Sequence, residues 1–184
     1  MSAGGFRRGP ARLAYSGRFD VVEYDVTPPG AGDDVLVRQV IRHPGAVTVA
    51  AFEDGRLTLV RQYRPAVDAV VAELPAGKLD AGESPLACAA RELEEETGRT
   101  ARTFTELADY LISPGWSDER MWLYLAEGLA DGSASPQGAE EVHMEVATVT
   151  LAEAVAMVHD GTIRDAKSIV GVLLVRDHIE ARRV

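Results

Sequence analysis

The 184-residue sequence predicts an α+β fold in which a few helices pack on a mixed sheet. Most regular segments alternate apolar and polar residues or contain short apolar runs rich in β-branched side chains, which is typical of strands. Helical periodicity is confined to the segments 84–97, 151–160 and 165–181. The turn-forming residues at 53–56 also predict a hairpin between two of the strands.

Turn-forming residues separate the predicted strands. A cluster of proline and glycine at 27–33 ends the first strand, and His43-Pro44-Gly45 ends the second. The turn at 53–56 implies that the segments on either side of it pair along their lengths. A loop rich in glycine, serine and proline is expected at 128–139. The strands themselves are expected at 19–26, 35–41, 46–52, 57–63, 103–111, 119–126 and 143–149.

The helix at 84–97 has clear signals at both ends. Ser84 can cap its start, Pro85 suits its first position, and Gly98 ends it. Cys88 inside this helix is expected to be a small buried residue rather than a nucleophile. The stripe expected to pack on the sheet consists of Leu86, Ala90, Leu93 and Thr97.

Charge and composition exclude several classes of function. The chain carries 29 acidic and 19 basic residues, and a net charge of −10 argues against a nucleic-acid binder. No apolar run reaches the roughly 18–20 residues that a membrane span needs, and no secretory signal is expected. The single cysteine fits a reducing cytoplasm. Residues 1–11, rich in glycine and arginine, are expected to form a flexible tail.

Three glutamates share one face of the helix at 84–97. Glu92, Glu95 and Glu96 are spaced i, i+3 and i+4, where like charges repel one another. They also lie in the last turn, where the helix dipole disfavours negative charge. A hard cation such as Mg²⁺ or Mn²⁺ would compensate both costs. The alternative, a solvated acidic face, is the commoner reason for a glutamate-rich helix.

The wider segment 77–98 resembles the Nudix box, Gly-x5-Glu-x7-Arg-Glu-U-x-Glu-Glu-x-Gly-U, in which U is aliphatic. Arg99 stands at the final aliphatic position, which is a packing site. The residues that match at the required spacing are Gly77, Glu83, Arg91, Glu92, Leu93, Glu95, Glu96 and Gly98.

This resemblance implies a Nudix hydrolase, an α/β/α sandwich that cleaves nucleoside diphosphate derivatives with divalent metal. It implies that Glu92, Glu95 and Glu96 hold two or three Mg²⁺ or Mn²⁺ ions and that Arg91 pairs with Glu83. With metal bound, the acidic site would accept a small diphosphate. The resemblance divides the chain into an N-terminal antiparallel strand extension at 12–44 and a Nudix domain at 45–184.

Segments outside the box resemble ADP-ribose pyrophosphatases, notably 43–47, 60–64 and 73–77. Pro114, sixteen residues after Gly98, also follows that pattern. The resemblance implies that the carbonyl of Ala76 binds metal, on a strained turn with Gly77. It assigns substrate contacts to Arg61, Arg64, Glu73 and Glu119, with Glu73 alternatively binding a neighbouring arginine.

The expected reaction is hydrolysis of ADP-ribose to AMP and ribose 5-phosphate. The resemblance places the general base on a loop before the last strand, at Glu140 or Glu141, and the sequence does not choose between them. The alternatives are a pyrophosphatase of sugar nucleotides, dinucleotides or flavin nucleotides, and a sensor that binds a nucleotide without cutting it. A homodimer formed through the N-terminal strands is expected, with Phe19 and Tyr24 as candidates for stacking on adenine.

Overall fold

The computed structural model describes residues 3–32, 34–135 and 143–182. The chain divides into two compact units. The first contains Met1–Pro44 and Leu111–Arg120, and the second contains Gly45–Tyr110 and Met121–Val184. None of the helices within the described ranges is long and apolar enough to cross a membrane.

The first unit contains a four-stranded antiparallel sheet centred on β3 (Asp20–Thr27). Its other strands are β1 (Arg7–Arg8), β2 (Arg12–Tyr15) and β4 (Leu36–Arg42), and a short 3₁₀ turn, η1, covers Ala3–Gly5. The strands β3 and β4 agree with the sequence prediction to within about two residues. The strands β1 and β2 were not expected, and β1 falls within the segment assigned to a flexible tail.

Side-chain contacts explain why these short, arginine-rich segments join the sheet. Arg12 forms two hydrogen bonds with Asp25 on β3, at 2.6 and 2.9 Å. The guanidinium of Arg8 lies 4.4 Å from the ring centroid of Tyr24, which is buried. Both contacts join residues that are distant in sequence, so no periodicity within the segments reveals them.

The remaining strands form a seven-stranded mixed sheet with the path β11–β6–β5–β10–β9. The strand β7 pairs with β6 and β8 pairs with β5. The strands are β5 (Ala46–Glu53), β6 (Arg56–Arg64), β7 (Ala69–Glu73), β8 (Ala76–Lys78), β9 (Arg99–Leu111), β10 (Arg120–Asp131) and β11 (Glu145–Thr150). The helices are α1 (Pro85–Thr97), α3 (Leu151–His159) and α4 (Ala166–Ala181).

The hairpin predicted at 53–56 is present but short. Asp54 and Gly55 both have positive φ, of 50° and 76°, as a tight two-residue hairpin turn requires. Only two residue pairs join β5 to β6 next to this turn. The expected pairing along the whole of both strands is therefore wrong. Beyond the turn β6 pairs with β7 and β11, while β5 pairs with β8 and in parallel with β10.

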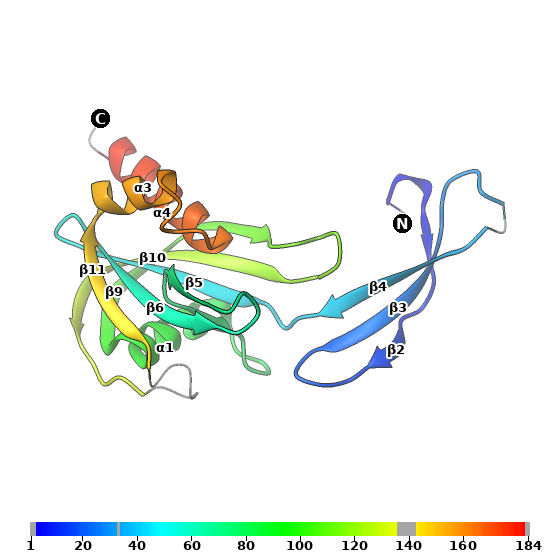
Figure 1. Ribbon diagram of the computed structural model, residues 1–184, viewed down its shortest axis with the longest axis horizontal. Helices are drawn as coiled ribbons and strands as arrows, with labels where there is room; N and C mark the ends of the chain where they lie inside the picture. The colour runs from blue at the N-terminus through cyan, green and yellow to red at the C-terminus, as the bar shows by residue number, and fades with distance from the viewer. Residues whose placement is uncertain (1–2, 33, 136–142, 183–184) are drawn as a thin grey trace. The chain divides into compact units, whose positions relative to one another are not determined.

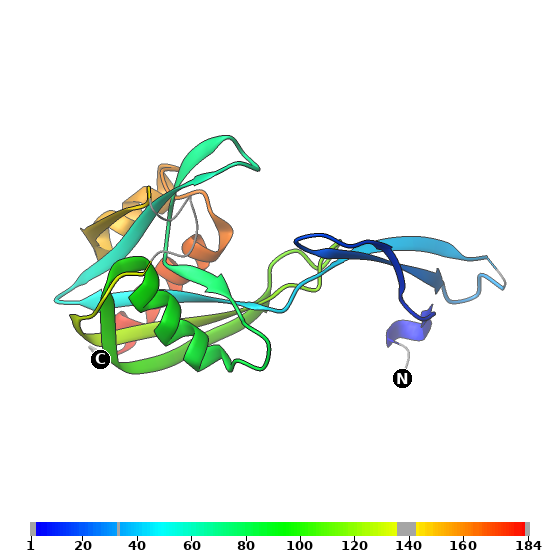
Figure 2. The same cartoon turned by 90° about the horizontal axis from the view of Figure 1, so that it is seen from below.

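The helices cover both faces of this sheet, with α1 on one side and α3 and α4 on the other (Figures 1 and 2). The strand β5 is buried on both faces, so its alternate side chains enter two separate cores. Val47, Val49 and Ala51 pack against α1, whereas Ala50 packs with Val172 and Val175 of α4. This arrangement is the expected α/β/α sandwich within a mixed α+β fold.

Candidate active site

The helix α1 begins and ends where the sequence predicts. The side chain of Ser84 accepts a hydrogen bond from the backbone N–H of Ala87 at 3.2 Å, and Pro85 opens the helix. Gly98 adopts the left-handed conformation, and its N–H donates to the carbonyl of Glu94 at 2.8 Å. Both ends are thus determined by local chemistry, and they set which residues fall in the last turn.

The face of α1 that packs on the sheet matches the predicted stripe only in part, because Leu93 is buried but two other members are exposed. Leu86 is 50% exposed, and Ala90 is also exposed. Glu96 is turned inward because its carboxylate accepts a hydrogen bond from the backbone N–H of Ala76 at 3.0 Å. A polar contact with β8 therefore outweighs the apolar pattern of the helix. The buried face consists of Cys88, Ala89, Leu93 and Glu96.

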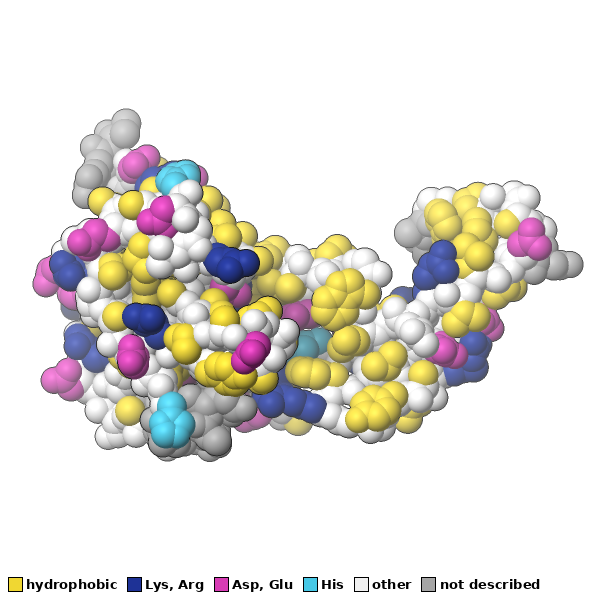
Figure 3. Space-filling model, in the orientation of Figure 1, with side chains coloured by type: hydrophobic (Ala, Val, Ile, Leu, Met, Phe, Trp, Pro, Cys, Tyr) yellow, Lys and Arg dark blue, Asp and Glu magenta, His cyan; other side chains and the backbone are white. Residues whose placement is uncertain are grey.

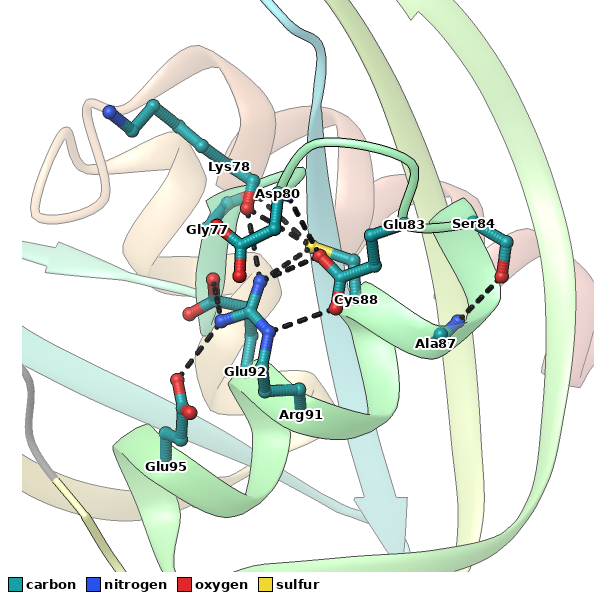
Figure 4. A network of polar contacts seen from close by, with 10 residues as sticks. All are labelled: Gly77, Lys78, Asp80, Glu83, Ser84, Ala87, Cys88, Arg91, Glu92 and Glu95. Carbon is teal, nitrogen blue, oxygen red and sulfur yellow. Dashed lines mark hydrogen bonds and ion pairs between the residues drawn. The ribbon is translucent and has the colours of Figure 1, made fainter.

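Arg91 is the centre of a polar network on α1 (Figure 4). Its Nε and Nη2 atoms each donate to one carboxylate oxygen of Glu83 at 2.9 Å, which forms the expected pair. Its Nη1 atom donates to Glu92 at 2.7 Å and to Glu95 at 3.0 Å. Nη2 also donates to the backbone carbonyl of Lys78 at 3.1 Å. One guanidinium therefore ties the helix to the preceding loop and faces three carboxylates.

This network shifts the ionisation of its members. Hydrogen bonds from Arg91 lower the pKa of Glu83 to about 2, and the backbone N–H of Asp80, which donates to the same carboxylate at 3.0 Å, acts in the same direction. Burial raises the pKa of the Cys88 thiol, and the side chain is fully buried. Cys88 therefore stays protonated and acts as a packing residue, as expected.

The backbone at Gly77 lies directly against the carboxylate of Glu92. A Cβ atom placed on Gly77 would be 1.9 Å from Cδ of Glu92, so only glycine fits here. The strained turn expected at Ala76 and Gly77 is not present. Neither residue has positive φ, and both belong to β8, which pairs with β5. Close approach of a side chain, rather than unusual backbone geometry, explains the glycine.

The free edge of β8 points toward α1. Gly77 pairs with Val47, the N–H of Val49 donates to the carbonyl of Pro75, and the N–H of Leu79 donates to the carbonyl of Gly45, just before β5. Because these bonds alternate along an antiparallel pair, the backbone groups of Ala76 and Lys78 point away from β5. The N–H of Ala76 reaches Glu96, and its carbonyl lies on this same edge.

The carboxylates of α1 contact Arg91 and the edge of β8. Within the described parts of the chain, no group of three His, Cys, Asp or Glu side chains is arranged to hold a metal. The donor types nevertheless suit a hard divalent ion, because carboxylate oxygens and one edge carbonyl share this face. Glu92, Glu95, Glu96 and the carbonyl of Ala76 therefore fit the metal that the box implies.

Arg64 and Glu73 form a second polar cluster on β6 and β7. Nε and Nη2 of Arg64 donate to the two carboxylate oxygens of Glu73, both at 2.7 Å. Lys167 donates to the same carboxylate and pairs with Asp165 at 2.8 Å. Hydrogen bonding to Glu73 raises the pKa of Arg64, and the charge of Glu96 adds to this effect. Arg64 is therefore held mainly by the buried carboxylate of Glu73.

Burial alone would raise the pKa of Glu73, but its bonds to Arg64 and the charge of Lys167 outweigh that effect and lower it. Glu73 thus binds a neighbouring arginine, one of the two possibilities that the sequence left open. Arg61 does not join this cluster. It lies three residues before Arg64 on β6, and side chains alternate between faces along a strand, so Arg61 points to the opposite face.

The remaining expected site residues are Glu119, Glu140 and Glu141. Glu119 belongs to the first unit, where its carboxylate is 3.9 Å from Nε2 of His43. The ring of His43 stacks on Phe19, with centroids 5.2 Å apart. Glu140 and Glu141, the candidates for the general base, lie outside the described residues.

Comparison with known proteins identifies the family. A model of the NUDIX domain matches residues 42–170. The chain belongs to the Nudix hydrolase family. An ADP-ribose pyrophosphatase of Bacillus subtilis (strain 168) is 38% identical over 149 residues, covering 79% of this chain and 80% of that protein. An ADP-ribose pyrophosphatase of Mycobacterium tuberculosis (strain ATCC 25618 / H37Rv) is 42% identical over 152 residues, covering 82% and 72%.

A solved structure titled "Crystal structure of ADP compounds hydrolase" shares the fold of this Nudix protein. The TM-score is 0.86, and the match covers 99% of this chain and 98% of that chain at 23% sequence identity. Because the match includes nearly all of this chain, it covers the N-terminal sheet as well as the Nudix sandwich.

The sequence does not point to Lys167 or Asp165 as neighbours of the Nudix site. One physical signal was nevertheless present. Lys167 lies in the first turn of α4, where the helix dipole disfavours positive charge. A cation at such a position needs a partner, and the sequence alone does not show that the partner is Glu73.

Proposed function

We propose that this Nudix hydrolase cleaves the diphosphate bond of ADP-ribose and releases AMP and ribose 5-phosphate. The observation that carries the proposal is the glutamate face of α1, which lies against the free edge of β8 and is joined to it by the hydrogen bond from Ala76 to Glu96. The similarity to two ADP-ribose pyrophosphatases over most of the chain supports the choice of substrate.

Mg²⁺ or Mn²⁺, two or three ions per site, would be held by Glu92, Glu95, Glu96 and the carbonyl of Ala76. When bound, the metal supplies charge neutralisation of the diphosphate and a lower pKa for the attacking water. Arg91 must then share the carboxylates of Glu92 and Glu95, which it contacts in this structure. Its bidentate bond to Glu83 would keep it in place when it does so.

The protein residues would orient the substrate and accept the proton of the attacking water. The exposed side of the Arg64 guanidinium would bind the diphosphate, because Arg64 retains donors that Glu73 does not use. Glu140 or Glu141 would accept the proton of the attacking water, whose oxygen forms the new bond to phosphorus as the phosphoanhydride bond breaks. Arg61 and Glu119 remain candidates for further substrate contacts.

The protein is proposed to act as a homodimer through its N-terminal sheet. Apolar side chains are strongly exposed there, including Leu13 at 64%, Tyr15 at 63% and Val37 at 50%. Figure 3 shows hydrophobic side chains on the visible face of this unit. Exposed apolar groups of this size are typical of an interaction surface.

A cytoplasmic location stays a prediction from the single cysteine.

A substrate panel tests the proposed function. ADP-ribose, a GDP-sugar, a diadenosine polyphosphate, NADH and nucleoside triphosphates would each be incubated with the protein, with Mg²⁺ and with EDTA. We expect the highest kcat/KM for ADP-ribose, with AMP and ribose 5-phosphate as products and no turnover in EDTA. A higher kcat/KM for another compound would mean that ADP-ribose is not the preferred substrate, but the proposed diphosphate hydrolysis would still hold. Binding of nucleotide without any turnover in Mg²⁺ would instead identify a sensor.

A further inference from the structure

The first turn of α4 contacts the cluster that holds Arg64. Glu73 is only 2% exposed and receives hydrogen bonds from two cations, because Oε2 accepts from both Arg64 and Lys167 while Oε1 accepts from Arg64. Lys167 is itself 8% exposed. We propose that Lys167 is a positioning residue that fixes the Glu73 carboxylate, and through it the guanidinium of Arg64, for binding the diphosphate. This inference rests on the proposed role of Arg64.

The position of Lys167 is unfavourable by itself, so its partners must compensate for it. A buried ammonium group is costly, and the N-terminal end of a helix adds an unfavourable dipole. Asp165, which caps α4, accepts a hydrogen bond from the backbone N–H of Ser168 at 3.0 Å and pairs with Lys167 at 2.8 Å. Lys167 is therefore held between Asp165 on its own helix and Glu73 on β7.

The same turn also fixes the backbone next to Glu73. The N–H of Leu74 donates to Oγ of Ser168 at 2.8 Å, and that hydroxyl donates to Asp165 at 2.6 Å. Gly171, one turn further along α4, lets the helix approach closely, because a Cβ there would be 2.4 Å from Cδ1 of Leu74. The first turn of α4 thus holds both the side chain of Glu73 and the backbone of Leu74.

This arrangement determines which donors of Arg64 are left for a ligand. Nε and Nη2 are taken by Glu73, whereas Nη1 makes no hydrogen bond within the described part of the chain. The plane of the guanidinium follows the plane of the Glu73 carboxylate because the bond is bidentate. Without Lys167 the carboxylate of Glu73 can rotate. The direction in which the N–H groups of Arg64 Nη1 point then changes as well. A displacement of about 1 Å at a reacting group can lower the rate by about 100-fold.

Kinetics of four variants test this role. Lys167→Met removes the ammonium and keeps the length of the side chain, Lys167→Arg restores a cation, and Arg64→Met removes the group being positioned. Arg176→Met is the control, because it removes a cation from α4 at a site whose partner is Asp177. Activity would be measured on whichever diphosphate compound the wild-type protein hydrolyses best, with melting temperatures for all variants.

We expect Lys167→Met to lower kcat/KM by about 10- to 100-fold, the usual cost of losing an outer partner of a functional group. Lys167→Arg should recover part of this loss, and Arg176→Met should stay within about twofold of wild type. In the Arg64→Met background, Lys167→Met should have no more than about a twofold effect, because both changes act on the same group. Equal losses in both backgrounds, or wild-type kcat/KM in a folded Lys167→Met variant, would overturn the proposal.

A second measurement is independent of substrate. The Nε–H resonance of Arg64, assigned by its loss in Arg64→Met, reports the bidentate bond to Glu73 in ¹⁵N-labelled protein. It should shift and exchange faster with water in Lys167→Met and remain unchanged in Arg176→Met. An unchanged signal in Lys167→Met would refute the positioning role even if the protein hydrolysed no ADP-ribose. Absence of ADP-ribose hydrolysis by the wild-type protein would refute only the proposed function.

Discussion

The carboxylate of Glu92 occupies the space that a side chain on Gly77 would need. A Cβ on Gly77 would be 1.9 Å from the Cδ of Glu92, far inside van der Waals contact. The glutamate that opens the acidic face and the glycine that lies 15 residues earlier are thus one packing unit. This contact connects the box glycine with the proposed metal site.

Gly77→Ala should displace Glu92 and reduce activity. Because the methyl group cannot coexist with the carboxylate, we expect kcat/KM to fall by about 10-fold or more. Circular dichroism and steady-state kinetics would separate loss of fold from loss of function. Gly115→Ala is the matched control, because a Cβ there meets nothing within 4 Å and its φ is not positive. Full activity of Gly77→Ala would contradict the placement of Glu92.

Glu96→Gln should lower activity and metal affinity together. Metal neutralisation of charge is worth several kcal/mol in a transition state, so the rate should fall by about 100-fold or more. Mg²⁺ should raise the melting temperature of the wild-type protein but not of this variant, since only an ion bound to the folded state stabilises it. Glu94→Gln is the control, because Glu94 accepts from the N–H of Ser133. If Glu96→Gln turned over substrate as fast as the wild-type protein, the assignment of Glu96 as a metal ligand would be wrong.

The pair of Glu83 and Arg91 should make stability depend on acid pH. The pKa of Glu83 is about 2 in the folded protein and 4.5 as its ordinary value. The folded state therefore binds fewer protons, and the pair contributes stability that is fully present above pH 4.5 and lost as pH falls toward 2. The difference in unfolding free energy between wild type and Glu83→Gln should shrink between about pH 6 and about pH 3.

Urea denaturation at these pH values measures the effect. Glu180→Gln, a change at an exposed position near the end of α4, is the control for removing one glutamate. A difference for Glu83→Gln that does not change with pH would mean that the folded state does not lower the pKa of Glu83.

Charged residues on the N-terminal sheet should disrupt the proposed dimer. Leu13→Asp together with Val37→Asp would place two charges among exposed apolar side chains, and burying either in an interface is costly. Light scattering at micromolar concentration should report a dimer for the wild type and a monomer for this variant. Val67→Asp, at a residue of the second unit that is 65% exposed, should remain a dimer. A monomeric wild-type protein would contradict the dimer.

Local signals in the sequence were sufficient for several elements. Ser84 marks the start of α1 and Gly98 marks its end, each through a hydrogen bond to a residue within four positions of it. Asp54 and Gly55 form the hairpin turn because both tolerate positive φ. The spacing of the box glutamates was enough to predict a shared acidic face, and the resemblance to the Nudix box implied the pair of Arg91 with Glu83.

Other features depend on contacts between distant segments. The periodicity of α1 predicted the burial of Leu93 but not that of Glu96, which is turned inward by its bond to Ala76, 20 residues earlier. The pairing of β6 with β7 and β11 follows from competition among strands, which the hairpin turn does not decide.

The sequence by itself determined the family, the ends of α1 and the residues of the acidic face, because these depend on spacing within one segment. Only the tertiary structure decided that Lys167 meets Glu73 across 94 residues of chain and that Arg64 binds the same carboxylate. A buried ion pair of this kind forms only when the sheet and α4 pack together, and no local pattern encodes which partners will meet.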